Sequence, residues 1–253
     1  MTIDRRFIHL NSTASTNNDL KARIAAADGP VWDVISAKTQ TGGRGRLGRS
    51  FFSPPGGLYF SAALPLKGTE TNIPCLTLAA GLCVCTALEE ACGIAPRIKW
   101  PNDVYLNGKK LCGILCELVT GRTPAAVVGA GVNLTVQKSG IPEELQDKMT
   151  SLRAEGVSAP APDALVRSIV EKLDKAVYVD RILSDASAAA NYMEQVSARS
   201  LLTGKTVSFA ADGQSLSGVF TGVSPTGAAL IRLPDGTTRA VVSGEITVGQ
   251  KSG

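Results

Sequence analysis

The hydrophobic positions of the chain change their spacing near residue 200. Before that point, strand-like runs are interspersed with helical stripes, of which the clearest are Ile73–Cys92 and Asp163–Val179. After it, short alternating runs follow one another closely, with glycine-containing turns between them. We therefore expect a larger domain over residues 1–200 and a small β-barrel over residues 201–253.

The larger domain is predicted to be α+β, with a mixed β-sheet built largely from hairpins and with helices on one side. Strands are expected at Phe7–Leu10, Val31–Ala37 and Leu58–Leu64, and the pair Asn107-Gly108 predicts a hairpin turn because both residues tolerate positive φ. The helix that starts at Ile73 is apolar on most sides, but its apolar run stops at Glu89. It is shorter than the roughly 20 apolar residues that a membrane span needs, so we expect a buried core helix.

Composition and charge narrow the possible functions. The 253 residues are 44% apolar and 19% charged, as in globular proteins, and a net charge of +4 argues against a broad nucleic-acid-binding surface. His9 is the one histidine, which argues against a catalytic triad, a multi-histidine metal site and a histidine proton relay. The six cysteines form no C-x-x-C pair, so we expect reduced core thiols in a cytoplasmic protein rather than a zinc site.

The most informative local feature is the loop Gly43–Arg49, in which glycines alternate with Arg44, Arg46 and Arg49. Its glycines match G-x-G-x-x-G, but a dinucleotide-binding fingerprint needs a helix to begin here, and the following Pro54-Pro55-Gly56-Gly57 prevents one. Glycines let backbone amides approach an anion, and arginines can grip phosphate or carboxylate. The loop therefore predicts an anion-binding element, with a solvated basic loop or a nucleic-acid contact as alternatives.

A lysine and three glycines add to this picture. Lys99 ends an apolar strand just before a Trp-Pro-Asn-Asp turn, where it could neutralise charge growing on a phosphoryl oxygen. Asp103, the last residue of that turn, is interpreted as structural. Gly113 interrupts one strand, and Gly129 and Gly131 interrupt another. Because glycine weakens a strand unless something must approach it closely, we expect a flat ligand across the sheet.

Taken together, these motifs resemble those of the biotin protein ligases, the biotin–[acetyl-CoA-carboxylase] ligases. The resemblance covers nearly the whole chain from about residue 7. It rests on an ordered set of motifs: Ser15-Thr16-Asn17, Gln40, Gly43–Arg49, Ser53-Pro54, Lys99–Asp103, Lys110–Glu117 and Gly129–Leu134. It implies a class II synthetase-like catalytic domain over residues 1–200 and an SH3-like C-terminal domain over residues 201–253.

The resemblance also implies a reaction. Biotin and Mg-ATP form biotinyl-5′-AMP, and a lysine of the biotin carboxyl carrier domain of acetyl-CoA carboxylase, or of another biotin-dependent carboxylase, then attacks it. The catalytic residues implied are Lys99, Arg44 and Arg46. Those implied to bind biotin are Ser15, Thr16, Asn17, Gln40, Arg44, Gly45, Arg46, Lys99, Gly113, Gly129 and Gly131. Those on the nucleotide side are Arg46, Arg49, Phe51 and Asn133, and the metal ligands are not identified.

The chain departs from the family pattern in two places. Phe51 replaces the Trp of many members and Leu47 replaces an Arg, which weakens stacking and lowers the charge of the loop. Only 14 residues precede Ser15, too few for the family's DNA-binding domain. We therefore expect a monofunctional ligase that contacts neither DNA nor membrane, with a homodimer left open. The alternatives are a lipoate or octanoate ligase of the same superfamily and a non-catalytic binding module.

Overall fold

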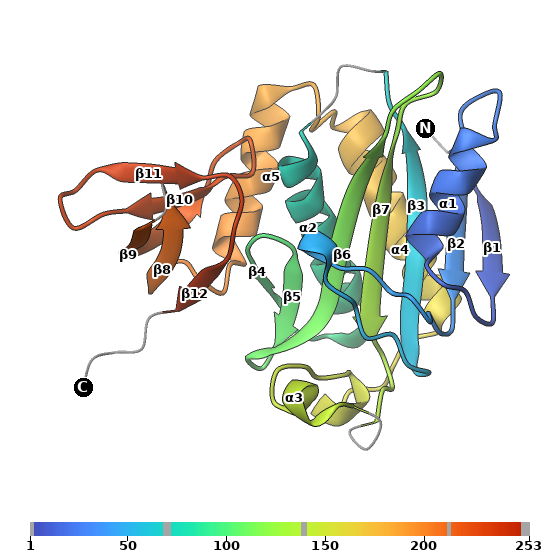
Figure 1. Cartoon of the computed structure of the whole chain (residues 1–253), viewed down its shortest axis with the longest axis horizontal. Coiled ribbons are helices and arrows are strands. Elements are labelled where there is room, and N and C mark those ends of the chain that lie inside the picture. Colours follow the sequence, from blue (N-terminus) through green and yellow to red (C-terminus); the bar gives the residue numbers. More distant parts are fainter. Residues whose placement is uncertain (1–2, 68–71, 138–140, 212–213, 249–253) are drawn as a thin grey trace.

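Two sheets of different size organise the molecule, and Figure 1 shows them side by side in the computed structural model. The structure describes residues 3–67, 72–137, 141–211 and 214–248. Within these ranges, a seven-stranded mixed sheet with flanking helices is followed by a five-stranded antiparallel sheet. The predicted α+β class, with a smaller C-terminal β-domain after the large sheet, is confirmed.

The large sheet has the strand order β1-β2-β3-β7-β6-β5-β4. Its strands are β1 (Arg6–Leu10), β2 (Asp33–Ala37), β3 (Gly57–Pro65), β4 (Arg97–Lys99), β5 (Asp103–Leu106), β6 (Lys109–Val119) and β7 (Ala125–Asn133). The predicted turn joins β5 to β6, with φ of 48° at Asn107 and 81° at Gly108. β1 and β2 pair in parallel, and the chain crosses between them through α1 (Thr16–Ala25), so the sheet is mixed as predicted.

Helices cover both faces of this sheet, which corrects the expectation that they lie on one side. Side chains alternate along each strand, so Val34 and Val128 belong to one hydrophobic cluster, whereas Ile35 and Val127 belong to another. The first face is covered by α2 (Ile73–Cys92) and α4 (Pro162–Asp174), while α5 (Ala186–Ala198) packs against α2 and against the second sheet. The second face is covered by α1, which buries Leu20 completely.

The apolar helix α2 is the central element of the core. Its length and composition would allow it to cross a membrane, but 72% of its apolar window is buried inside the molecule. The Asn72 side chain caps its first turn through the amide of Cys75, and Gly93 ends it with a left-handed φ of 65°. The prediction of a buried core helix is confirmed.

The cysteines agree with that packing. All six are free, and four are buried, whereas Cys92 and Cys116 are half-buried. Burial raises the pKa of the Cys75 thiol to about 11, so it stays protonated at neutral pH. The prediction of reduced core thiols therefore holds for the four that lie in the core.

Residues 201–248, which contain the second sheet, are here called the C-terminal module. Its strands are β8 (Thr206–Ala211), β9 (Gln214–Val223), β10 (Ala229–Arg232), β11 (Thr238–Val241) and β12 (Ile246–Val248). The last of them, β12, pairs with β8. The module is joined to the large domain by a buried hydrogen bond of 3.0 Å from Trp100 Nε1 to the carbonyl of Gly227.

Candidate active site

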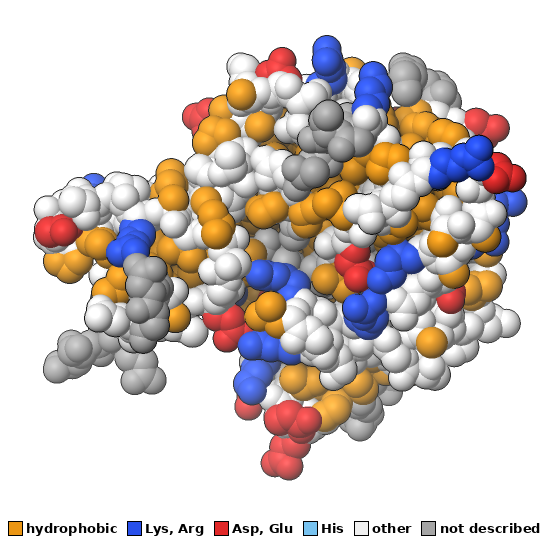
Figure 2. Space-filling view, turned by 45° about the horizontal axis from the view of Figure 1, so that its top comes forward, with side chains coloured by type: hydrophobic (Ala, Val, Ile, Leu, Met, Phe, Trp, Pro, Cys, Tyr) orange, Lys and Arg blue, Asp and Glu red, His pale blue; other side chains and the backbone are white. Residues whose placement is uncertain are grey.

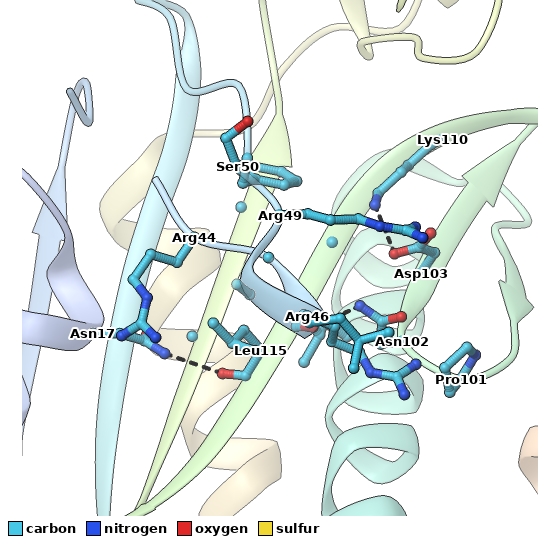
Figure 3. Close-up of a pocket in the computed structure, with 18 of the residues that line it drawn as sticks. Asn17, Arg44, Arg46, Arg49, Ser50, Pro101, Asn102, Asp103, Lys110 and Leu115 are labelled. Atoms are coloured by element: carbon cyan, nitrogen blue, oxygen red, sulfur yellow. Dashed lines mark hydrogen bonds and ion pairs between the residues drawn. The ribbon is translucent and has the colours of Figure 1, made fainter. Parts of the chain in front are cut away.

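A cavity of about 270 Å³ lies where the glycine-containing strands, the loop Gly43–Arg49 and the C-terminal module meet. We call this loop the arginine loop. Figure 2 shows Lys and Arg side chains gathering near the centre of the face on which the module adjoins the large domain. In the close-up of Figure 3, Arg44, Arg46 and Arg49 extend from the arginine loop and Lys110 from β6, around one space.

The structure brings together all but one of the residues that the sequence assigned to a site. Those that line the cavity are Ser15, Thr16, Asn17, Gln40, Arg44, Gly45, Arg46, Arg49, Phe51, Lys99, Gly113, Gly129 and Gly131. The exception is Asn133, which is 2% exposed and lies at the end of β7, outside the cavity lining. Its Nδ2 donates to the carbonyl of Thr150 over 2.9 Å, while its buried Oδ1 accepts no hydrogen bond within the described residues.

One end of the cavity is lined by neutral polar groups, and we call it the polar end. Gln40 Oε1 accepts hydrogen bonds from the Thr16 amide at 2.9 Å and from Thr16 Oγ1 at 3.2 Å. Its Nε2 donates to Ser53 Oγ over 3.0 Å. Behind them, Ser61 Oγ lies 2.7 Å from Thr16 Oγ1 and 2.5 Å from Asn17 Oδ1. These side chains are therefore held in fixed orientations before a ligand arrives.

The three predicted glycines, Gly113, Gly129 and Gly131, do allow other atoms to approach the strands closely. In this structure the atoms that approach belong to the protein's own side chains and not to a ligand. A Cβ at position 129 would lie 2.1 Å from Asn17 Oδ1. At positions 113 and 131 it would lie 2.7 Å and 2.4 Å from atoms of the Phe51 ring. The expectation that glycine marks a close contact is correct for the sheet, and in this structure Asn17 and Phe51 occupy the space above it.

The arginine loop carries its guanidinium groups in three directions. Arg44 Nη1 donates to Asn18 Oδ1 at 2.9 Å, and Arg49 pairs with Glu245 of the C-terminal module. Arg46 is partly buried, which lowers its pKa, while the nearby Asp103 and Glu245 act in the opposite direction. Leu47 forms the tip, with a left-handed φ of 56° and 77% of its surface exposed. A non-glycine residue in that region of φ is strained, as is common at functional sites.

Sequence reasoning missed Lys110 and treated Asp103 as structural. Both line the cavity, and Lys110 Nζ lies 2.7 Å from Asp103 Oδ1 in an ion pair that is not an aligned hydrogen bond. Lys110 Nζ also lies 5.5 Å from the Phe51 ring centroid. Lys99 approaches from β4, with its Nζ 5.3 Å from the Tyr105 ring centroid. The sequence did contain a pattern that could have identified Lys110, because a charged residue stands three positions before Gly113.

The module also contributes to the cavity, through Gly244, Glu245, Ile246 and Thr247. Across the whole site, five cationic side chains therefore converge: Arg44, Arg46, Arg49, Lys99 and Lys110. Such a group stabilises an anion with several negative oxygens, while the polar end can orient a neutral hydrogen-bonding group. The arrangement suits the transfer of a phosphoryl or acyl group on an oriented substrate.

Sequence comparison finds two matching family descriptions. The Biotin/lipoate A/B protein ligase family matches residues 10–133, and the Biotin protein ligase C terminal domain matches residues 203–249. A Biotin--[acetyl-CoA-carboxylase] ligase of Paracoccus denitrificans is 32% identical over 233 residues, which cover 90% of this chain and 94% of that one. A Bifunctional ligase/repressor of Bacillus subtilis is 37% identical over 177 residues, which cover 69% of this chain but 49% of that one. The chain thus spans about half the length of the latter relative.

Comparison with solved structures gives the same result over nearly the full length. The Biotin protein ligase from Aquifex aeolicus in complex with biotin and ATP superposes with a TM-score of 0.78 and 31% identity. That match covers 97% of this chain and 99% of the other. It includes both the large sheet and the C-terminal module.

Proposed function

The chain belongs to the biotin protein ligase family, and we propose that it activates biotin with ATP and transfers it to a lysine of a carrier protein. The observation that carries the proposal is the cavity, in which a preorganised polar end is continuous with five cationic side chains. In the first step, the biotin carboxylate attacks the α-phosphorus of ATP, which gives biotinyl-5′-AMP and releases pyrophosphate. In the second, a carrier lysine attacks the acyl carbon and AMP leaves.

The first step joins two anions, so repulsion between them is the main barrier that the protein must offset. Arg44, Arg46 and Arg49 lie on one loop, and Lys99 and Lys110 face it from the sheet. Charges arranged in this way screen the approach of the carboxylate and stabilise the extra negative charge that develops on the phosphoryl oxygens. No histidine or thiol chemistry is required.

The polar end supports biotin as the substrate to be oriented. A ureido ring presents two N–H donors and one carbonyl acceptor, which match the hydroxyl and amide groups of Ser15, Thr16 and Gln40. The cyclic disulfide of lipoate has no such groups. We therefore assign the polar end to the ureido ring and the cationic group to the carboxylate and phosphates.

The far side of the cavity suits the nucleotide. Asn133 Oδ1 is a buried acceptor without a partner among the described residues, and the amino group of adenine is a donor of the required type. Phe51 offers one aromatic face for stacking, with less area than a Trp would give. Asn133 lies on the same face of β7 as Gly131, which the Phe51 ring covers, so we propose that ligand binding moves the Phe51 ring.

Magnesium would enter with ATP. The described residues include no cluster of three His, Cys, Asp or Glu side chains that could hold a metal. Magnesium commonly binds through nucleotide phosphates and one or two carboxylates, and the cavity lining includes two, Asp103 and Glu245. These two residues fit the metal, which would neutralise phosphate charge when bound.

The second step needs a neutral lysine amine. The cations that line the cavity lower the pKa of an incoming ammonium group by like-charge repulsion, and so favour its deprotonation. The free amine then attacks the acyl carbon of the mixed anhydride, the bond from that carbon to the phosphate oxygen of AMP breaks, and the nitrogen loses one of its two protons to solvent and keeps the other in the amide. A reducing compartment with ATP, the cytoplasm, agrees with six free thiols.

The test is a direct assay with purified protein, biotin, Mg-ATP and a biotin carboxyl carrier domain. We expect release of pyrophosphate and a gain of one biotinyl group on the carrier, measured by mass spectrometry. Lipoate in place of biotin is the matched control and should give neither product. Absence of both pyrophosphate and labelled carrier with biotin would contradict the proposal, and equal labelling with lipoate would favour the alternative ligase.

A further inference from the structure

Glu117, on β6, makes contacts that the reaction described above does not use. Its side chain is 21% exposed and faces the same side of the sheet as Gly113. Its Oε2 accepts from Asn17 Nδ2 at 2.9 Å, and its Oε1 accepts from Lys21 Nζ at 2.8 Å. The same Oε1 lies 3.4 Å from Arg44 Nη1 of the arginine loop. One carboxylate thus connects a strand, a helix and the loop.

The carboxylate is held in its ionised form. Burial, the largest single influence, raises the pKa of Glu117, but hydrogen bonds from Lys21 and Asn17 and the charges of Lys21 and Arg44 outweigh it and leave the pKa below its ordinary value. An ionised acceptor forms stronger hydrogen bonds than a neutral one. Glu117 is therefore a firm anchor for its two donors, Lys21 and Asn17, at neutral pH.

The contacts of Asn17 show what this anchor fixes. Asn17 Oδ1 lies against Ser61 Oγ, and its Nδ2 donates to Glu117 and, at 3.3 Å, to the carbonyl of Leu115. Both N–H donors of the amide and one acceptor position of its oxygen are engaged, and Asn17 is 5% exposed. Figure 3 shows the bond between Asn17 and Leu115 at the edge of the cavity. Asn17 cannot turn towards a ligand without breaking its bond to Glu117.

Asn17 in turn fixes the polar end. It lies next to Thr16 in α1, and both contact Ser61 Oγ, so an Asn17 amide that rotated would release the hydroxyl that supports Thr16. Its Oδ1 also fills the space above Gly129. The orientation that Glu117 imposes on Asn17 is therefore passed to the groups assigned to the ureido ring.

The loop side of the contact is different, because Glu117 holds Arg44 only loosely, and the hydrogen bond of Arg44 Nη1 goes to Asn18 Oδ1. Its distance from Glu117 exceeds hydrogen-bonding range, and its side chain is 43% exposed. When an anion enters, Arg44 can move towards it, and Lys21 still neutralises Glu117. Because Lys21 remains paired with Glu117, Arg44 can move away without leaving the partly buried Glu117 carboxylate unpaired.

We propose that Glu117 is a positioning residue: it orients Asn17 at the polar end and holds Arg44 near the cavity until an anion arrives. The proposal rests on the proposed function, since it assigns biotin to the polar end. It predicts that loss of the carboxylate weakens biotin binding through Asn17, while ATP, which binds at the other end, is little affected.

The test uses Glu117→Gln in the full chain, with biotin and ATP affinities measured separately by calorimetry. We expect the Kd for biotin to rise about tenfold, the loss typical of a charge-assisted hydrogen bond, and the Kd for ATP to change less than about twofold. Glu89→Gln is the matched control, because Glu89 pairs with Arg199 away from the cavity with 30% of its side chain exposed. It should leave both affinities unchanged.

A double-mutant cycle separates positioning from general damage. In an Asn17→Ala background, Glu117→Gln should cost less than about twofold in biotin affinity, because the residue through which it acts is already gone. Additive losses would overturn the proposal, as would an unchanged biotin Kd or equal weakening of both ligands. If the Gln variant does not fold, Glu117→Asp, which keeps the charge, takes its place in the cycle. Its effect on the Kd for biotin should again disappear in the Asn17→Ala background. Wild-type protein that does not bind biotin would overturn the proposed function instead.

Discussion

At the scale of single residues, the two lysines of the cavity occupy different positions. Lys110 lies beside Phe51 and Gly113, above the centre of the glycine-containing strands. Lys99 lies over Tyr105, and its charge reaches Glu245 of the C-terminal module. β5 separates β4, which carries Lys99, from β6, which carries Lys110, so a ligand that lies over β6 and β7 is nearer to Lys110. We therefore assign the larger effect on phosphoryl chemistry to Lys110.

This assignment can be tested by comparing alanine variants of three lysines. Lys110→Ala should slow biotin-dependent pyrophosphate exchange by about 10²–10³-fold, the loss expected when a cation that stabilises a transition state is removed. Lys99→Ala should slow it by about tenfold, because it acts from the rim. Lys109→Ala is the control, since its Nζ lies 3.8 Å from exposed Asp147 and outside the cavity lining, and it should have no effect. A larger loss for Lys99 than for Lys110 would reverse the assignment.

The parts of the site that sequence could predict are those whose residues are neighbours in the chain. The arginine loop could be predicted because its glycines and arginines alternate within seven residues. Glu117 and Asn17 are 100 positions apart, and Arg49 and Glu245 are 196 apart. These pairs depend on the packing of α1 against the sheet and on the docking of the module. Periodicity and turn chemistry carry no information about either.

At the scale of elements, β6 and β7 form the surface beneath the cavity, and the shape of that surface depends on glycines, which have no side chain. The Phe51 ring lies over Gly113 and Gly131, closer than any Cβ would permit. By contrast, Gly81 in α2 would accept a Cβ, because its nearest neighbour, Ile114 Cδ1, would be 3.5 Å away. The two positions therefore predict opposite outcomes for the same substitution.

Gly131→Ala should lower the free energy of unfolding by about 1–3 kcal/mol, the usual cost of overpacking. In a Phe51→Ala background the same substitution should cost less than about 1 kcal/mol, because the ring that it displaces is absent. Gly81→Ala is the control and should raise stability by about 0.5–1 kcal/mol, as alanine does in a helix. Urea titration of the variants measures all three values. If Gly131→Ala lowered the free energy of unfolding equally in both backgrounds, the strand and not the Phe51 ring would be the part that shifts to accommodate the new Cβ.

Element boundaries also show where sequence patterns stop being sufficient. The stripe over residues 163–179 predicts one helix, but α4 ends at Asp174 and a wider π-helical turn continues to Val179. Both segments bury the same kind of residue on the same side, so hydrophobic spacing does not separate them. Similarly, α1 has only Leu20 and Ile24 as buried apolar residues, too few to predict that it would cover the second face of the sheet.

At the scale of the whole molecule, the two sheets share one core. Phe220 and Ile231 of the C-terminal module belong to the same hydrophobic cluster as Leu76 and Leu88 of α2. Gly227 lies so near the start of α2 that a Cβ there would be 2.6 Å from the amide nitrogen of Cys75. In contrast, the pair Arg49–Glu245 is exposed on both sides, and such pairs contribute about 0–1 kcal/mol. The module is therefore held mainly by apolar packing and by the Trp100 hydrogen bond.

A shared core implies that the module and the large domain unfold together. Calorimetry should show one transition with equal calorimetric and van't Hoff enthalpies. Gly227→Ala should lower the stability of that single transition by about 1–2 kcal/mol for its left-handed backbone and by about 1–3 kcal/mol more for the clash with α2. Gly236→Ala is the matched control: its φ of 86° nearly equals the 85° of Gly227, but no atom lies within 4 Å of its Cβ position. Two separate transitions, or equal losses for the two variants, would mean that the module is an independent unit, and the cavity would then form only while the two parts are docked.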